Sequence, residues 1–381
     1  MKQFFTKQNL QRAVSYLLVA ALASAATWFV APRTTKLGNL EAIIQNRFIG
    51  EADETAMEDA AAAAMVASIG DQWSYYISAA QYSAHKENQN NDYVGIGITI
   101  MQRADGTGYD IVEVTAGGPS EKAGLLPGDI ITHVAGQSAE NMDFTQLRGL
   151  IMGKKNTKVA ITVLRDQQIL EFSVTRKAIH TKATAGIMLT DTVGYVYISN
   201  FHGNAGEETI EVVKDLLNQG AESLVFDVRN NPGGYVDEMV ELLDYLLPEG
   251  DLFRSVSSMG WKEVEKSNAA CLEMPMAVLI NGNSYSAAEL FAAALHEYDW
   301  AVTVGEPTTG KSYYQTTIEL GDGSAVQLST GAYTTPKGVN LTEVGGLVPD
   351  VVVEPGEEAV MEWSDDLQLQ AAVQALIQEN K

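Results

Sequence analysis

The 381-residue sequence contains one cysteine, Cys271, so no disulfide can form within the chain. A catalytic cysteine needs an electropositive setting and a nearby base to become a thiolate. Cys271 instead follows two alanines and precedes Leu272, which favours a quiet, partly buried thiol. Neither a covalent cross-link nor a thiolate nucleophile is therefore expected to define this protein.

Basic residues are also scarce, because 25 lysines and arginines stand against 49 acidic residues and give a net charge of −24. Binding to a nucleic-acid backbone needs clustered cations, and so does electrostatic attachment of a protein body to anionic lipid. We therefore expect no nucleic acid as a partner, and the acidity favours solubility.

One long apolar run stands at the N-terminus. Lys2, Lys7 and Arg12 precede residues 13–31, an uncharged and largely apolar stretch that would span roughly 28 Å as a helix. That length is close to the hydrocarbon core of a membrane, and the leading basic residues favour a cytoplasmic N-terminus. We expect a single-pass anchor in the cell membrane with an extracytoplasmic body. Residues 23–25, Ala-Ser-Ala, offer the alternative of a cleaved signal peptide and secretion.

Residue patterning divides the rest of the chain. Helical spacing over 40–50 and an alanine-rich stretch over 51–69 predict helices, and the polar run 86–91 predicts a linker. We expect five parts: a cytoplasmic tip and anchor or signal peptide (1–36), an N-terminal helical segment (37–90), a domain-sized β module (91–178), a larger core (179–355) and a helical tail (356–381).

The middle module is built from short β-runs beginning with 94–100, together with one helix over Phe144–Ile151. From residue 179 onwards strands and helices alternate, which predicts β-α-β units on a mainly parallel sheet. The expected strands of this core are 193–199, 223–228, 276–280 and 301–304, its expected helices are 207–219, 235–246 and 287–296, and a tail helix is expected over 365–378.

Two segments of the middle module resemble a PDZ domain. The first is Gly95-Ile96-Gly97-Ile98, and the second runs from Gly118 to Ile131 and contains an Ala-Gly-Leu-Leu-Pro-Gly-Asp sequence. In that family a glycine loop offers backbone N–H groups to a peptide carboxylate, and the next strand pairs with the peptide. The resemblance implies that proteins or peptides bind by their C-termini at Gly95, Ile96, Gly97 and Ile98. Glycines that only make turns would not explain the ordered second segment.

Residues 305–312 match the phosphate-binding P-loop pattern letter for letter. A nucleotide site requires a helix after this loop, so that the helix N-terminus faces the phosphates. Residues 313–318 are instead rich in aromatic and β-branched side chains, which is typical of a strand, and the turn Gly321-Asp322-Gly323 follows. The sequence therefore disfavours nucleotide binding and leaves Lys311 to be explained.

Lys311 resembles the lysine of the carboxy-terminal processing peptidases, the tail-specific type of PDZ-containing serine protease. That family has a serine in a small-residue motif that opens a helix, then a Gly-Glu-x-Thr-x-Gly-Lys segment, then a glutamine four residues later. Here Ser286 stands in such a motif, Lys311 follows 25 positions on, and Gln315 comes next. The likeness includes residues 70–76 and 229–234 and covers about 40–355.

The resemblance implies a serine endopeptidase with a Ser286–Lys311 dyad and Gln315 orienting the lysine amine. A serine hydroxyl needs a neighbour that takes its proton, and lysine does so only when it is neutral. Backbone donors for the oxyanion are implied at Ala287, which begins a helix, and at Gly233 or Gly234. The choice between the two glycines stays open.

The fold class implied is α/β, with a mixed-sheet β-α-β serine protease core that is crotonase/ClpP-like by resemblance, an inserted PDZ domain and an N-terminal helical segment. No cofactor and no metal is expected, because no pair among the five histidines has metal-ligand spacing. Family analogy allows a homodimer through the N-terminal helices and the tail. A binding scaffold without turnover is the second hypothesis.

The sequence also contains alternatives to this nucleophile and this base. Ser284 is the rival serine, and family register favours Ser286. A serine–histidine–acid triad is disfavoured because His296, on the helix after Ser286, would lie about 15 Å from its start. The chain departs from the family pattern at Tyr285, where alanine is usual, and at Met152, where an arginine thought to couple the PDZ module to the active site is usual. Arg148, one turn earlier, is a possible substitute.

Overall fold

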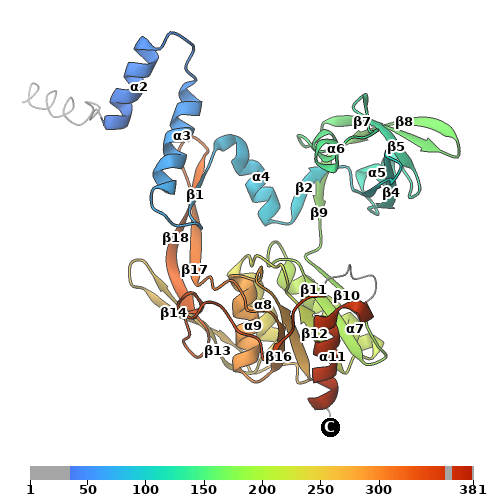
Figure 1. Ribbon diagram of the computed structural model, residues 1–381, viewed down its shortest axis with the longest axis vertical. Coiled ribbons are helices and arrows are strands. Elements are labelled where there is room, and N and C mark those ends of the chain that lie inside the picture. The colour runs from blue at the N-terminus through green and yellow to red at the C-terminus, as the bar shows by residue number, and fades with distance from the viewer. Residues whose placement is uncertain (1–34, 357–362, 380–381) are drawn as a thin grey trace, which may run out of the picture. The chain divides into compact units, whose positions relative to one another are not determined.

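A computed structural model describes residues 35–356 and 363–379 (Figure 1). The chain divides into two compact units, one up to Gln72 and one from Trp73 onwards. The first unit holds helices α2 (Lys36–Arg47) and α3 (Glu54–Ala67), whose first turns are capped by the side chains of Thr35 and Asp53. No described helix is long and apolar enough to cross a membrane, and the span predicted over 13–31 lies outside the described residues.

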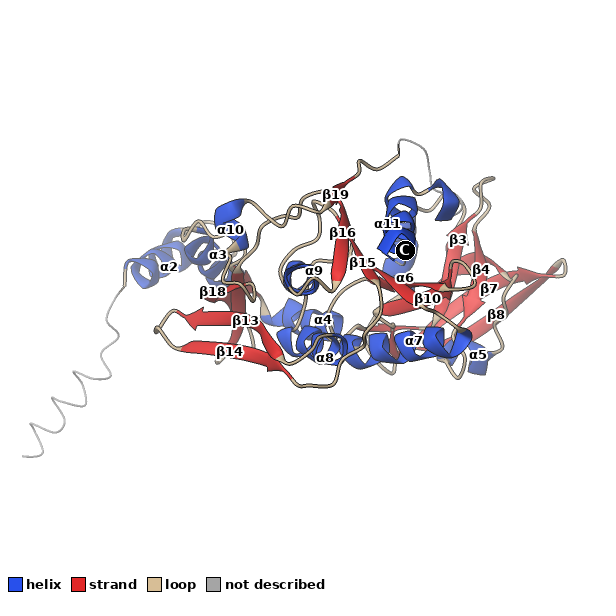
Figure 2. Ribbon diagram, turned by 90° about the horizontal axis from the view of Figure 1, so that it is seen from below, coloured by secondary structure: helices blue, strands red, loops and turns tan. Residues whose placement is uncertain are grey.

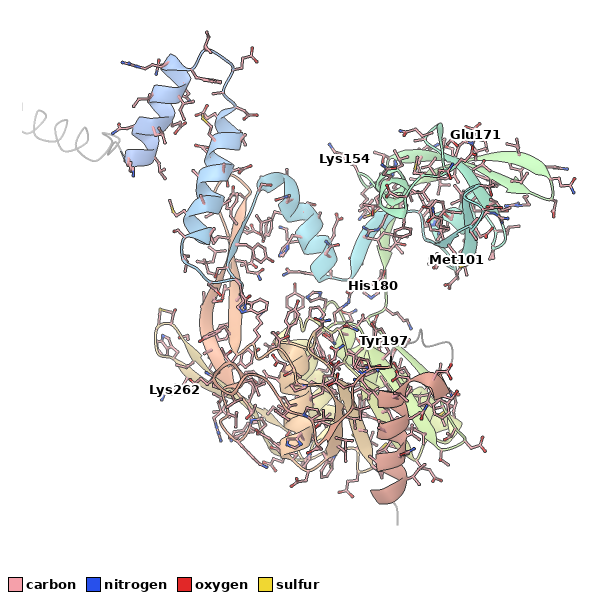
Figure 3. The ribbon with its side chains drawn as sticks, viewed as in Figure 1. Met101, Lys154, Glu171, His180, Tyr197 and Lys262 are labelled. Atoms are coloured by element: carbon pink, nitrogen blue, oxygen red, sulfur yellow. The ribbon has the colours of Figure 1, made fainter. Side chains whose placement is uncertain are left out.

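A β-sheet module follows in the second unit, and Figure 3 labels Met101, Lys154 and Glu171 on it. Its antiparallel sheet has the order β3-β4-β5-β7-β8, with β6 paired to β5. The elements are β3 (Ile98–Gln102), β4 (Tyr109–Val114), α5 (Pro119–Ala123), β5 (Ile130–Val134), β6 (Gln137–Ser138), α6 (Phe144–Ile151), β7 (Lys158–Arg165) and β8 (Gln168–Thr175). Tyr109 and Leu147 are among the side chains of its buried core.

A two-stranded ribbon joins this module to the rest of the second unit. Strands β2 (Asp92–Gly95) and β9 (Lys177–His180) pair in antiparallel fashion. The single strand predicted over 94–100 is therefore wrong, because the chain leaves β2 after Gly95 and enters β3 at Ile98. The break coincides with Gly97, whose φ of 73° is readily reached only by glycine.

The core sheet has the order β10-β11-β12-β15-β16-β19, and all its pairs are parallel except β10 with β11. This confirms the predicted, mainly parallel β-α-β arrangement. Its strands are β10 (Thr184–Met188), β11 (Val193–Ile198), β12 (Ser223–Asp227), β15 (Met276–Ile280), β16 (Ala301–Gly305) and β19 (Val351–Val352). Every residue of β12 and β15 is buried, as expected for strands covered on both faces.

Helices cover the two faces of the core sheet (Figure 2). Alternate residues of β12, such as Phe226, pack with α7 (Ala205–Gln219), α8 (Val236–Leu246) and α9 (Ala287–Glu297). The intervening residues, such as Val225, pack against α11 (Leu367–Glu379). The short 3₁₀ helix η1 (Trp363–Asp365) precedes α11. The predicted tail helix is thus a structural part of the core.

A second, antiparallel sheet has the order β1-β18-β13-β14, with β17 also paired to β18. Its strands are β1 (Tyr75–Ile77), β13 (Gly250–Ser257), β14 (Lys262–Ser267), β17 (Tyr313–Glu319) and β18 (Ala325–Thr334), and α10 (Leu341–Val344) follows β18. Strand β17 begins two residues after Lys311, which confirms the expected strand at this position. The helix that a P-loop requires does not follow the loop.

The linker predicted over 86–91 is wrong for its first four residues. Residues 79–89 form helix α4 (Ala79–Gln89), which buries Tyr82. The polar side chains of its last turn include Lys86, whose ammonium group lies 4.2 Å from the Tyr82 ring centroid and 3.2 Å from Glu319. A polar run therefore forms the exposed end of a helix here, because the buried face is set by residues earlier in the helix.

Candidate active site

Ser286 stands where strand β15 turns into helix α9, as the N-cap of that helix. Its φ of 62° and ψ of −124° lie in a region of backbone conformation that residues other than glycine rarely adopt. A sharp, strained turn from strand to helix is a known way to present a nucleophile, and backbone strain of this kind gathers at functional sites. The backbone thus singles out Ser286 among the serines of its loop.

Ser284, the rival serine, is surrounded by groups that it holds in place. It is fully buried, and its hydroxyl donates to the carbonyl oxygen of Val228 at 2.7 Å and accepts the N–H of Asn281 at 3.0 Å. These bonds tie two loops at the ends of neighbouring strands. The geometry therefore favours Ser286 over Ser284 as the nucleophile.

The buried carboxylate of Glu289 joins the two halves of the predicted dyad. One oxygen accepts the backbone N–H of Ser286 at 2.9 Å and that of Lys311 at 2.8 Å. The other accepts the Gly310 N–H at 2.6 Å and the Thr308 hydroxyl at 2.5 Å. Burial raises the pKa of Glu289, and these hydrogen bonds oppose the rise. Sequence reasoning gave Glu289 no role, although an acid within the apolar, alanine-rich stretch 287–295 was a usable signal.

The Lys311 side chain is nearly buried and lies among aromatic rings. Its Nζ is 4.2 Å from the centroid of the Trp73 ring and 5.6 Å from that of Tyr285. Its backbone carbonyl accepts a hydrogen bond from the Tyr333 hydroxyl. Burial raises the pKa of Tyr333, and a hydrogen bond with the Ser286 side chain acts in the opposite direction. The Tyr333 hydroxyl therefore contacts the Lys311 backbone and lies near the Ser286 side chain.

The two candidate oxyanion glycines differ in what surrounds them. A Cβ added at Gly233, where φ is 84°, would lie 2.8 Å from the Cβ of Ser286 and 2.9 Å from the backbone nitrogen of Ala287. A Cβ added at Gly234 would instead run into the backbone of Phe201. Gly233 is therefore the glycine beside the predicted nucleophile. Its own N–H donates to the Asn231 side chain at 2.8 Å in this structure.

Gln315 lies on β17, as expected, four residues after Lys311. Its amide nitrogen donates to the Tyr313 carbonyl and to the Ser329 hydroxyl, each at 3.0 Å. The NH₂ group is thus used within the antiparallel sheet, and the amide oxygen is the part of Gln315 that suits a donor such as a lysine amine.

An ion-paired network lies beside the loop that carries Gly233, and sequence reasoning missed it. The Arg229 guanidinium binds Asp227 at 2.6 Å and Asp366 at 2.8 Å, and it also donates to Gln368. Burial opposes the charged forms, but these contacts raise the pKa of Arg229 and lower that of Asp366. The network fastens the start of helix α11 to the loop after β12. The sequence alone does not reveal this network, because the network depends on helix α11 packing beside the loop after β12.

The predicted peptide-binding residues of the sheet module border a groove. Ile96, Gly97 and Ile98 line a cavity of about 250 Å³. The rest of the lining comes from helix α6 and the residue after it, from strands β2 and β3, and from the residue after β9, namely Phe144, Arg148, Ile151, Met152, Tyr93, Ile100 and Thr181. Gly95 ends strand β2 just before this loop. Three of the four predicted residues thus face one groove, with Arg148 and Met152 in the same lining.

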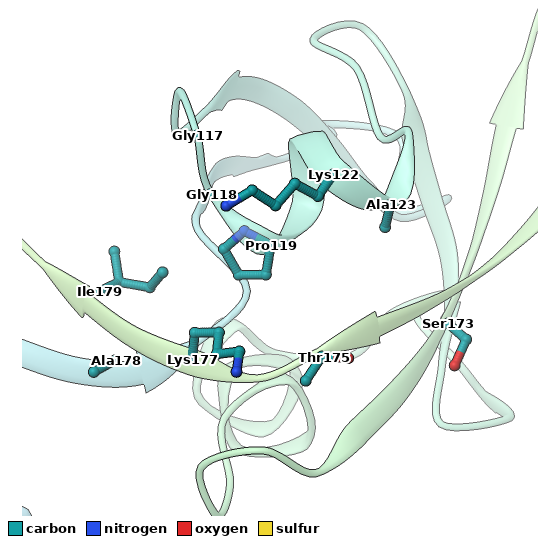
Figure 4. Close-up of a pocket in the computed structure, with 10 residues that line it drawn as sticks. All are labelled: Gly117, Gly118, Pro119, Lys122, Ala123, Ser173, Thr175, Lys177, Ala178 and Ile179. Atoms are coloured by element: carbon teal, nitrogen blue, oxygen red, sulfur yellow. The ribbon is translucent and has the colours of Figure 1, made fainter.

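A second cavity of about 580 Å³ lies elsewhere on the same module, between the segment 117–123 and strands β8 and β9 (Figure 4). Lys122 and Lys177 both line it. Nothing in the sequence pattern pointed to this cavity, because its wall is formed by segments that are distant along the chain.

Comparisons with known proteins find two family matches within this chain. Residues 192–353 match peptidase family S41, and residues 111–165 match a PDZ domain. A carboxyl-terminal-processing protease of Synechocystis is 31% identical over 332 residues, which cover 84% of this chain and 76% of that protein. A CtpA-like serine protease of Staphylococcus aureus (strain COL) is 30% identical over 323 residues, and the match spans 84% of this chain and 64% of the relative's length.

Among solved structures, a Bacteroides fragilis protein assigned to the S41 proteases superposes with a TM-score of 0.55 at 17% identity, covering 89% of this chain and 97% of that one. The chain belongs to peptidase family S41, as a carboxyl-terminal processing serine protease with a PDZ domain. It therefore hydrolyses peptide bonds.

Proposed function

We propose that this protease is an endopeptidase in which Ser286 is the nucleophile and Lys311 is the general base. The observation that carries the proposal is the Glu289 carboxylate, which accepts the backbone N–H groups of both residues. Together with the strained backbone at Ser286, this fixes both ends of the dyad relative to one buried group. Such preorganisation is what covalent catalysis by a serine requires.

The chemistry runs in two stages. Neutral Lys311 takes the Ser286 proton as Oγ attacks the substrate carbonyl, and the resulting ammonium gives that proton to the leaving amine. Water then attacks the acyl-enzyme, with Lys311 again taking and returning a proton. The amide oxygen of Gln315 would accept a hydrogen bond from the lysine amine and orient it.

The oxyanion of each stage would be held by backbone N–H groups of Ala287 and Gly233. Ala287 is the first residue of helix α9, where N–H groups have no partner within the helix. The contact distances around Gly233 favour it over Gly234, because it adjoins both Ser286 and the Ala287 nitrogen. The Gly233 N–H must then exchange its bond with Asn231 for one with the oxyanion.

Substrate capture is assigned to the PDZ groove. Its loop residues Ile96, Gly97 and Ile98 suit a C-terminal carboxylate, and its apolar walls suit an apolar last side chain. Arg148 is the only charged residue in the described lining. It would attract the carboxylate and take the role that the usual arginine has at the position of Met152.

The remaining proposals concern architecture and location. The expected parts 1–36, 37–90, 91–178, 179–355 and 356–381 are proposed as the domain plan, with a crotonase/ClpP-like core. The apolar run 13–31 supports a single-pass anchor with the protease extracytoplasmic, or secretion after cleavage. Exposed apolar residues on α2, such as Leu40 and Ile43, support a homodimer. Membrane fractionation before and after carbonate extraction, and light scattering of the purified protein, test these points.

The catalytic proposal is tested by incubating an unstructured protein with wild type and variants and identifying fragments by mass spectrometry. Ser286→Ala and Lys311→Ala should each abolish fragment production while retaining the wild-type circular dichroism spectrum. Ser284→Ala is the matched control, and it should retain cleavage if its effect on stability is small. Cleavage by Ser286→Ala would overturn the assignment. Peptide binding by wild type without any turnover would favour the scaffold hypothesis.

A further inference from the structure

The Lys311 ammonium group faces two aromatic rings that come from distant parts of the chain. Its nitrogen lies 4.2 Å from the Trp73 ring centroid and 5.6 Å from the Tyr285 ring centroid. The two rings are 5.4 Å apart and inclined by 36°. Both distances from the nitrogen are within the roughly 6 Å over which a cation interacts with the face of an aromatic ring.

Hydrogen bonds at or next to each of the two residues hold its backbone in place. Trp73 directly precedes Ser74, whose hydroxyl accepts the Ser329 N–H at 3.0 Å, and strand β1 then pairs with β18. Tyr285 donates its backbone N–H to the Asn231 carbonyl at 3.1 Å and is followed by Ser286. The rings are therefore fixed to β18 on one side and to the loop of the nucleophile on the other.

An aromatic face attracts an ammonium ion much more strongly than a neutral amine, because the attraction is electrostatic. Burial acts the other way and favours the neutral amine. A general base has to be neutral when it takes a proton. The rings therefore favour the ammonium form of Lys311, whereas the proposed mechanism needs the neutral amine. This effect of the rings is present however strongly burial favours the neutral amine.

We propose that Trp73 and Tyr285 form an aromatic clamp that sets the pH range of activity by stabilising the ammonium form of Lys311. The inference rests on the proposed Ser286–Lys311 dyad. Trp73 and Tyr285 are positioning residues in this proposal, since they act through Lys311.

The test is the pH dependence of kcat/KM for one peptide substrate, which reports ionisations of the free enzyme. Trp73→Leu keeps the pocket apolar and removes the ring, so the acid limb of the profile should move to lower pH by roughly one unit. Tyr285→Leu should give a smaller shift in the same direction, because its ring is farther from Nζ. Trp73→Phe should fall between wild type and Trp73→Leu, and Tyr285→Phe should keep the wild-type acid limb.

A general loss of packing would lower activity at all pH values and would not produce this order of shifts. An acid limb that is unchanged or moved to higher pH in folded Trp73→Leu and Tyr285→Leu overturns the clamp. If Trp73→Leu does not fold, Trp73→Phe and Tyr285→Leu carry the same comparison. Full activity of Lys311→Ala would instead sink the proposed dyad, so the two failures are distinguishable.

Discussion

Ser286 and Lys311 donate their backbone N–H groups to the same carboxylate oxygen of Glu289, at 2.9 and 2.8 Å. Three of the four groups that face this carboxylate are backbone N–H donors and the fourth is the Thr308 hydroxyl, so an ionised acid can accept from all of them together. The relative position of the proposed nucleophile and base is thus set by a third, buried residue.

Glu289→Gln should therefore impair both catalysis and stability. Its NH₂ group would face donors and leave at least one of them unpaired, which costs about 1–3 kcal/mol in free energy of unfolding. We expect kcat to fall by roughly 10- to 100-fold, since small misplacements of reacting groups have effects of this size. Peptide hydrolysis and chemical denaturation measure the two effects. Glu306→Gln, which removes a negative charge from the same loop as Lys311, is the control, and an equal loss of activity there would contradict the prediction.

Gly233→Ala should abolish most activity. The added Cβ would meet the Cβ of Ser286 and the nitrogen of Ala287 at less than 3 Å, and φ at this position is 84°. We expect kcat/KM to fall by at least about 100-fold, the effect of losing one oxyanion donor. Gly282→Ala is the matched control in the neighbouring loop, because its Cβ would have no neighbour closer than 3.8 Å. Similar kcat/KM values for the two variants would argue against an oxyanion role for Gly233.

His180 gives the ribbon between the PDZ module and the core a pH-dependent contact; Figure 3 labels it. Its two ring nitrogens face Asp92 at 3.3 Å and Glu208 at 2.8 Å. Burial disfavours the imidazolium, but the hydrogen bonds to Glu208 and Asp92 outweigh it and raise the pKa of His180. A raised pKa in the folded state means that this stabilisation is complete below the ordinary histidine value of about 6.5 and is lost as pH rises through the folded value.

The expected effect is a stability difference between wild type and His180→Gln that is larger at pH 5.5 than at pH 8.5. The difference should stay within about 1 kcal/mol, because the side chain is partly exposed and the pairs are screened. Urea denaturation at both pH values measures it. A difference that grows towards pH 8.5 would show that the charged histidine is not the stabilising form.

Asp366→Asn should loosen the tail helix α11 from the loop after β12. The variant keeps the shape of the side chain but removes the charge that pairs with Arg229, and we expect a loss of about 1–3 kcal/mol at pH 7. Although burial opposes it, pairing with Arg229 lowers the pKa of Asp366. The contribution is therefore present above the ordinary carboxyl value and fades as pH falls through the folded one. Denaturation at pH 7 and in acid checks this, with exposed Asp191→Asn as the control.

Much of the core was predictable because local pattern and tertiary environment agree there. Strands such as β12 and β15 are continuous apolar runs, as strands buried on both faces must be. Strand β17 after Lys311 was predictable from its β-branched and aromatic residues, and this excluded the nucleotide site. Helix α4 was missed because its polar C-terminal end resembles a linker. Tyr82, the buried residue of this helix, lies in its first turn.

The candidate site was predictable only in part. The family resemblance implied Ser286, Lys311 and Gln315, but the contacts around them join residues far apart in sequence. Trp73 lies on the other side of the PDZ module from Lys311 along the chain, and only the pairing of β1 with β18 brings it near. Antiparallel strands β13 and β14 were missed for a different reason. Their exposed and charged residues weaken the alternation of apolar and polar positions by which a strand is predicted.

The left-handed backbone at Ser286 also affects how an inactive form of this protease is best made. Alanine at position 286 removes the hydroxyl but keeps a side chain in a conformation that costs roughly 1–3 kcal/mol. Glycine removes the hydroxyl and relaxes that conformation. A substrate-trapping protein built as Ser286→Gly should therefore melt at a higher temperature than either wild type or Ser286→Ala. The strained backbone at the proposed nucleophile therefore lowers the free energy of unfolding of the whole protein.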